Sequence, residues 1–117
     1  MRRGTVLFAC AMLLAGLVPS WAHSVLRRSS PADGAVLAQP PAEIRLTFNE
    51  AIETRFSVVE VSGPGGKVAA GALRADKQNE IAVGLPALPP GRYDVRWRVI
   101  SVDSHKVQGR LFFEVRP

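Results

Sequence analysis

Side chains that contain sulfur are almost absent from this sequence. The only cysteine is Cys10 and the only methionines are Met1 and Met12, so no thiol or thioether occurs beyond residue 12. A domain formed by the rest of the chain cannot use a disulfide, and a metal site within it cannot use a soft sulfur ligand. Any metal ion bound there must therefore be held by nitrogen and oxygen atoms.

Long apolar runs are also scarce. One such run, at residues 5–18, follows Arg2 and Arg3 and precedes a short stretch that ends in small residues at Ala22. It is shorter than the roughly 20 residues that a transmembrane helix needs. A short basic segment, an apolar stretch and small residues before a cut are typical of a secretory signal peptide. We predict a signal peptide over residues 1–22 and a soluble domain over 23–117; a retained signal anchor is the alternative.

The predicted mature chain has only a small net charge. Removal of the first 22 of 117 residues leaves 95, enough for one small domain. The formal net charge falls from +5 to +3 because Arg2 and Arg3 are lost, which leaves 13 basic against 10 acidic residues. A small excess that is spread along the chain is a weak argument for nucleic-acid binding. We therefore predict no nucleic-acid partner.

Helix-period patterns are lacking in residues 23–117, whereas short alternating runs are frequent. The run at 43–48 places Ile44, Leu46 and Phe48 on one face. The run at 92–102 places Tyr93, Val95, Trp97 and Val99 on one face and Asp94, Arg96 and Arg98 on the other. Further short runs, at 24–28, 56–61, 81–85 and 109–115, are separated by turn-forming residues. This pattern predicts an all-β fold, an antiparallel Greek-key sandwich or barrel of about seven strands.

Histidine is rare as well, and one of the two histidines lies at the predicted cut. If cleavage follows Ala22, His23 becomes the N-terminal residue and carries a free α-amine beside its imidazole. Those two nitrogens can close a six-membered chelate ring on one metal ion. Because the amine has an ordinary pKa of about 7.7 to 8.0, binding near neutral pH would release a proton. Cleavage would thus create half of a metal site.

The other histidine, His105, follows Asp103 by two positions. If the backbone there is extended, the two side chains point to the same side and offer a carboxylate oxygen and an imidazole nitrogen. A surface ion pair or a hydrogen-bonded turn is the ordinary explanation for such a pair. Taken with His23, the set comprises an amine, two imidazoles and a carboxylate. It suits a tetragonal Cu(II) centre, with zinc as the main competitor.

Three segments of the chain resemble the CopC family of periplasmic copper-binding proteins. They read HSVLRRSSPADGAVL, PPAEIRLTFNEAIE and LPPGRYDVRWRVISVDSHKVQGRLFFEV, and together they span most of residues 23–117. The resemblance implies a cupredoxin-like or immunoglobulin-like β-sandwich or barrel. It also implies one Cu(II) per chain, bound by the amine and imidazole of His23, by Asp103 and by His105. It further places Glu50 close to the copper as a residue that orients a ligand; a solvated strand-end carboxylate is the alternative.

The function that this resemblance implies is copper buffering, carriage and resistance in the periplasm, without enzymatic activity. A CopD-type inner-membrane copper transporter is the expected partner, and a monomer suffices for the site. A methionine site for Cu(I) is not expected, because Met1 and Met12 both lie in the predicted signal peptide. Two alternatives remain. One is a copper-dependent oxidative polysaccharide-cleaving monooxygenase, and the other is a metal-free adhesion-type sandwich.

Overall fold

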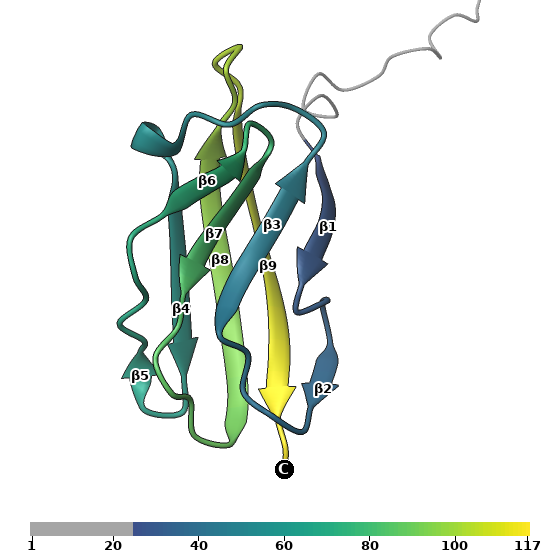
Figure 1. The fold of residues 1–117 in the computed structure, drawn as a ribbon, viewed down its shortest axis with the longest axis vertical. Coiled ribbons are helices and arrows are strands. Elements are labelled where there is room, and N and C mark those ends of the chain that lie inside the picture. Colours follow the sequence, from purple (N-terminus) through teal and green to yellow (C-terminus); the bar gives the residue numbers. More distant parts are fainter. Residues whose placement is uncertain (1–24) are drawn as a thin grey trace, which may run out of the picture.

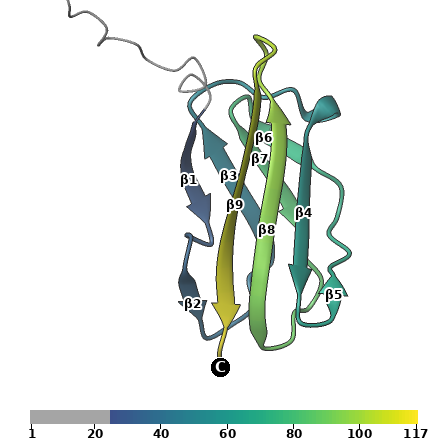
Figure 2. The same cartoon turned by 180° about the vertical axis from the view of Figure 1, so that it is seen from behind.

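The computed structural model describes residues 25–117, which form two sheets packed face to face (Figure 1). One sheet has four strands in the order β1 (Leu26–Ser30), β3 (Glu43–Phe48), β7 (Glu80–Gly84) and β6 (Arg74–Lys77). The other has five in the order β2 (Ala35–Leu37), β9 (Lys106–Val115), β8 (Gly91–Ile100), β4 (Val58–Gly63) and β5 (Gly66–Lys67), seen from the opposite side in Figure 2. A 3-10 turn, η3 (Thr54–Phe56), precedes β4. No helix among residues 25–117 has the length and hydropathy needed to cross a membrane.

The predicted all-β sandwich is confirmed, with more strands than the sequence indicates. The additional strands are short: β2 lies in the turn-rich stretch after β1, β5 has two residues, and β6 is exposed along its whole length. Alternation over so few residues gives no signal in a sequence. The pairing of β2 with β9 is parallel, whereas every other strand pair in the described region is antiparallel.

The core lies between the two sheets and contains the side chains that the alternation places inward. Ile44, Leu46 and Phe48 of β3 are buried, and so are the four inward residues of β8 from Tyr93 to Val99. Tyr93 stacks on Phe113 of β9, with ring centroids 5.3 Å apart. Trp97 is only 7% exposed, as predicted for a core residue. Each such side chain contributes about 1.5 to 3 kcal/mol through removal of apolar surface from water.

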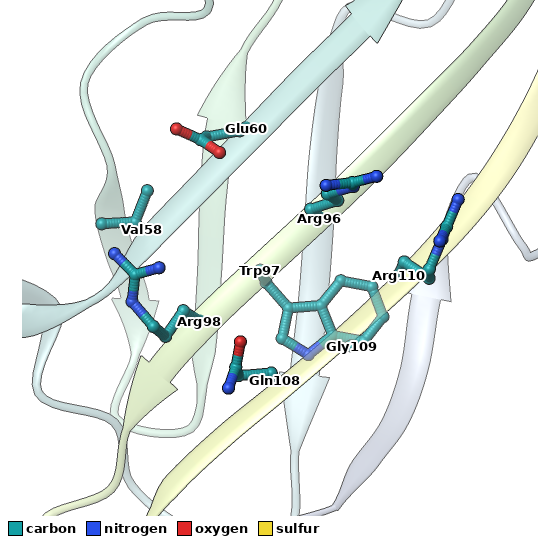
Figure 3. A pocket seen from close by; sticks show the side chains of 8 residues that line it. All are labelled: Val58, Glu60, Arg96, Trp97, Arg98, Gln108, Gly109 and Arg110. Atoms are coloured by element: carbon teal, nitrogen blue, oxygen red, sulfur yellow. The ribbon is translucent and has the colours of Figure 1, made fainter.

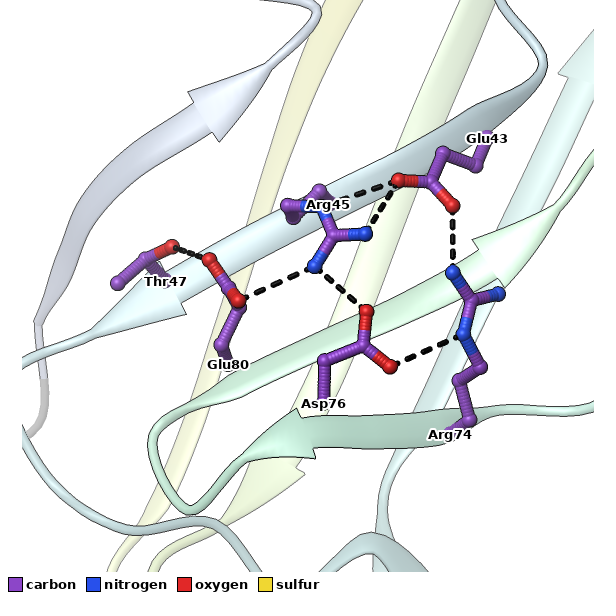
Figure 4. A network of polar contacts seen from close by, with 6 residues as sticks. All are labelled: Glu43, Arg45, Thr47, Arg74, Asp76 and Glu80. Atoms are coloured by element: carbon purple, nitrogen blue, oxygen red, sulfur yellow. Dashed lines mark hydrogen bonds and ion pairs between the residues drawn. The ribbon is translucent and has the colours of Figure 1, made fainter.

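The outer face of the four-stranded sheet carries a network of ion pairs (Figure 4). Arg45 of β3 lies 2.5 Å from Glu43, 2.7 Å from Asp76 of β6 and 3.0 Å from Glu80 of β7. Arg74 closes the network, 2.5 Å from Glu43 and 3.1 Å from Asp76. The hydrogen bonds from Arg74 and Arg45 lower the pKa of Glu43, and those from Arg45 and Arg74 lower the pKa of Asp76. The network therefore links three neighbouring strands through their charges.

Three segments that are distant in the sequence meet at one end of the sandwich. They are the loop between β8 and β9, the end of β3 and the start of β1 (Figure 1). This end holds the described residues that the sequence singles out as metal ligands.

Candidate metal centre

The loop that joins β8 to β9 is organised around Ser101. This serine is 1% exposed, and its hydroxyl donates a hydrogen bond to the Asp103 carboxylate. The same oxygen accepts the backbone N–H of His105 at 3.1 Å, and the Ser101 N–H donates to the His105 carbonyl at 2.9 Å. Ser104 adopts a left-handed conformation with φ 74°, and its N–H donates to the Ser101 carbonyl at 2.9 Å. The loop is therefore a closed turn with few alternative arrangements.

Within this turn Asp103 and His105 contact each other directly. The distance from Asp103 Oδ1 to His105 Nδ1 is 3.0 Å, and the two side chains are 48% and 42% exposed. The premise of an extended backbone at this point is wrong, because residues 102–104 form a turn rather than a strand. The turn itself brings the two side chains together. The two atoms are thus adjacent, but the Nδ1 atom itself is buried although much of the His105 side chain is exposed.

Hydrogen bonds keep the Asp103 carboxylate ionised. The Ser101 hydroxyl has the largest effect in lowering the pKa of Asp103, and the His105 side chain adds to it. A smaller part comes from a side-chain hydrogen bond with Glu50. An ionised carboxylate can bind a metal ion at neutral pH without first losing a proton.

Glu50 approaches the turn from the end of β3. It lies near enough to Asp103 to contribute to the lowered pKa of that carboxyl, although the two residues are far apart in the sequence. The backbone supports this placement, because the Val102 N–H donates to the Ala51 carbonyl at 3.0 Å and Ile52 forms a β-bridge with Ser101. The segment after β3 therefore lies against the base of the β8–β9 turn.

The start of the described chain is fixed at the same end. The Val25 N–H donates to Asn49 Oδ1 at 2.7 Å, and the Asn49 N–H donates to the Val25 carbonyl at 3.0 Å. Asn49 directly precedes Glu50, so the chain enters the fold beside the segment that contacts Asp103. The predicted ligand His23 and the predicted signal peptide, residues 1–22, lie outside the described residues.

Within residues 25–117, no group of three or more histidine, cysteine, aspartate and glutamate side chains is arranged to hold a metal ion. Asp103 and His105 would thus be part of a site that needs donors from elsewhere.

Sequence reasoning missed the two residues that position this end, Ser101 and Asn49. A serine two positions before an aspartate in a turn is a pattern that could have indicated Ser101. Nothing in the sequence indicates the pairing of Asn49 with Val25, because 24 positions separate them.

The protein is thus a small β-sandwich domain that carries a nitrogen and an oxygen donor in the β8–β9 turn. A family model described as the CopC domain matches residues 26–116, and the chain belongs to this family. The predicted resemblance is therefore confirmed.

Relatives cover nearly the whole chain. Protein YobA of Escherichia coli (strain K12) is 38% identical over 115 residues, 93% of this chain and 93% of YobA. Copper resistance protein C of Pseudomonas syringae pv. tomato is 34% identical over 119 residues, 94% of this chain and 92% of that protein. The crystal structure of CopC from Methylosinus trichosporium OB3b matches with a TM-score of 0.73 and 34% identity, over 81% of this chain and 95% of that chain.

Proposed function

We propose that this protein binds Cu(II) in the periplasm, where it buffers and carries copper and contributes to copper resistance. Membership of the CopC family supports a role in copper handling, as does the name of its relative, copper resistance protein C. The observation that carries the proposal is the contact between Asp103 and His105 at the end where the chain enters the fold.

The spacing of the two donor atoms supports a shared metal ion. Two ligand atoms that lie about 2.0 to 2.1 Å from a metal and subtend a right angle are about 2.9 Å apart. The 3.0 Å between Asp103 Oδ1 and His105 Nδ1 is close to this value. Because Nδ1 is buried, a metal ion could take both atoms as adjacent ligands only after the imidazole of His105 turns to expose this nitrogen.

The remaining ligands in this proposal are the α-amine and imidazole of His23, exposed by cleavage after Ala22. Chain length alone restricts a residue two positions before Val25 to about 7 Å from it. Val25 is held by Asn49, which directly precedes Glu50 and so lies at the end of the sandwich that carries Asp103, and this restriction favours a site at the same end. Glu50 is proposed as a positioning residue that orients Asp103 or the N-terminal amine.

The proposed cargo is one Cu(II) ion per chain. Nitrogen ligands with one carboxylate favour Cu(II) over the softer Cu(I). Met1 and Met12, the only methionines, lie in the predicted signal peptide, so no methionine site for Cu(I) is proposed. We propose that the protein is a monomeric carrier rather than an enzyme, with a CopD-type inner-membrane transporter as its partner. An anionic Asp103 ligand opposes the return to Cu(I) that oxygen activation by a monooxygenase would require.

The test is electron paramagnetic resonance of the chain that starts at His23, loaded with one equivalent of Cu(II). We expect a tetragonal spectrum with couplings to about three nitrogens, because one amine and two imidazoles are proposed as ligands. His105→Ala should remove one nitrogen coupling and weaken binding while the apo fold stays intact. A spectrum of loosely bound copper in the unsubstituted chain would contradict the proposal and favour a metal-free adhesion sandwich.

A matched control separates the amine from the imidazole of His23. One additional residue before His23 keeps the imidazole but moves the amine out of the chelate ring, so Cu(II) affinity should fall by at least about tenfold, or 1.4 kcal/mol. Calorimetry in buffers of different ionisation enthalpy should show proton release when the chain that starts at His23 binds Cu(II) near pH 7. Unchanged affinity after the extension would remove the amine from the site.

A further inference from the structure

The outer faces of the two sheets differ in how many of their arginines form ion pairs, although Arg28 of β1 on the four-stranded sheet has none among the described residues either. On the four-stranded sheet, Arg45 and Arg74 are each paired with carboxylates of neighbouring strands (Figure 4). On the five-stranded sheet, Arg96 and Arg98 of β8 and Arg110 of β9 form no ion pair with any residue from 25 to 117. All three are exposed. The second face therefore presents unneutralised positive charge.

These arginines lie around a groove of about 390 Å³ that spans β4, β8 and β9 (Figure 3). Its polar lining consists of the three arginines, Gln108 and Glu60. Glu60, its one carboxylate, lies opposite Arg96 in the strand register but forms its ion pair with Lys67, at 3.8 Å. We call this hollow the basic groove. It has an excess of cationic groups and no internal partner for them.

The register makes this arrangement costly for the isolated domain. Arg96 pairs directly with Arg110 across β8 and β9, and like charges directly opposite each other destabilise a sheet. The far half of the same face is different, because Arg92 lies 3.8 Å from Asp94 and Arg116 lies 3.1 Å from Glu114. Positive charge is thus concentrated in the half of the sheet nearer to the β8–β9 turn.

We infer that the basic groove is a docking surface for an extended acidic segment of a partner protein. Arg96 and Arg98 are two residues apart on one strand, so their Cα atoms are about 6.8 Å apart. Carboxylates at alternate positions of an extended peptide have the same spacing. Arginine binds carboxylates through two parallel hydrogen bonds, which favours this ligand chemistry. A hollow in a sheet face suits a peptide better than the flat surface of an anionic membrane.

The docking surface is separate from the candidate metal centre but adjacent to it. Arg98 precedes Ser101 by three residues, about 10 Å along an extended strand. A partner bound in the basic groove would therefore lie beside the end of the sandwich that carries Asp103 and His105. No residue of the candidate metal centre lines the basic groove, so docking there does not depend on copper binding.

The test is a titration of the full chain with a blocked synthetic peptide in which glutamate and threonine alternate. Binding is followed by the amide chemical shifts of the protein. We expect shift changes confined to β4, β8 and β9. Arg96→Gln with Arg110→Gln should weaken binding by about tenfold, because two charge-assisted contacts are lost. The matched double variant Arg28→Gln with Lys77→Gln removes the same charge from exposed positions on the other sheet, and it should bind like the unsubstituted protein.

Several results would overturn the inference. They are a lack of binding by the glutamate peptide, equal binding by a peptide with glutamine in place of glutamate, or an equal loss in both double variants. Binding to vesicles of phosphatidylcholine and phosphatidylglycerol without peptide binding would assign the face to a membrane surface. If the first double variant does not fold, the single change Arg98→Gln provides the same comparison. His105→Ala should weaken Cu(II) binding but leave peptide affinity unchanged. The copper proposal and the docking proposal can therefore fail independently of each other.

Discussion

Ser101 positions the two predicted ligands of the candidate centre, although its own hydroxyl is not a strong metal ligand. Its hydroxyl donates to Asp103 and accepts the His105 N–H, so one buried oxygen sets the positions of both predicted ligands. The left-handed Ser104 between them completes the reversal of the chain. Such backbone conformations cost about 1 to 3 kcal/mol and often lie at functional sites. The geometry of the pair therefore depends on neighbours that the pattern Asp-x-His does not contain.

Replacement of Ser101 tests this control. Ser101→Ala should lower the free energy of unfolding by about 1 to 2 kcal/mol, because a buried hydroxyl loses its hydrogen bonds. The pKa of Asp103 should rise toward its ordinary value, because the hydrogen bond that lowers it most is removed. Denaturant unfolding and a titration of the carboxyl carbon by nuclear magnetic resonance measure the two effects. Ser62→Ala, at an exposed position of β4, should change neither quantity.

The β8–β9 hairpin is the element that joins the core, the basic groove and the candidate centre. Its inward residues pack in the core, its outward arginines line the groove, and its turn carries Asp103 and His105. Close packing within the hairpin requires a glycine, because Gly109 faces Trp97 across the two strands. A Cβ at Gly109 would overlap with the Trp97 indole ring.

Gly109→Ala should therefore destabilise the protein. The indole would have to leave its rotamer or the strands would have to separate, at a cost of about 1 to 3 kcal/mol. Denaturant unfolding followed by tryptophan fluorescence measures this loss. Gly65→Ala is the matched control, since a Cβ at Gly65 would meet nothing within 4 Å. Equal stability of the two variants would show that Trp97 is not tightly packed against Gly109.

At the scale of the whole molecule, the carboxylates with lowered pKa values make stability depend on pH. Glu43, Asp76 and Asp103 all have a pKa below the ordinary value for their type in the folded state. A carboxyl group whose pKa is lower in the folded state stabilises the fold above its unfolded pKa, and this stabilisation is lost as the pH falls. The ordinary values are 4.5 for Glu43 and 3.8 for the two aspartates. Stability should therefore decline below about pH 4.5.

Arg45 provides the test of this pH dependence. Arg45→Gln removes the hydrogen bonds that help to lower the pKa values of Glu43 and Asp76, so both should rise. The variant should be less stable than the unsubstituted protein at pH 7, and it should lose less stability on acidification to pH 3. Urea midpoints at the two pH values measure the difference. Arg28→Gln, a change at an exposed position of β1, should lose as much stability at pH 3 as the unsubstituted protein. If Arg45→Gln also loses as much, the acid dependence of stability does not come from the ion-pair network.

The sequence by itself determined the features that depend on neighbours along the chain. Side chains alternate along a strand, so the burial of Ile44, Leu46 and Phe48 and the inward position of Trp97 could be predicted. The lack of sulfur beyond residue 12 likewise restricted any metal site there to nitrogen and oxygen donors.

Only the tertiary structure decided which distant groups meet. It brought Glu50 to Asp103, Asn49 to Val25 and Arg45 to Asp76 and Glu80. It also paired Arg96 with Arg110 and joined β2 to β9 in parallel. These contacts follow from strand register and sheet packing, which depend on the whole core rather than on any local pattern. A single sequence contains the residue types for such contacts but not the distances between them.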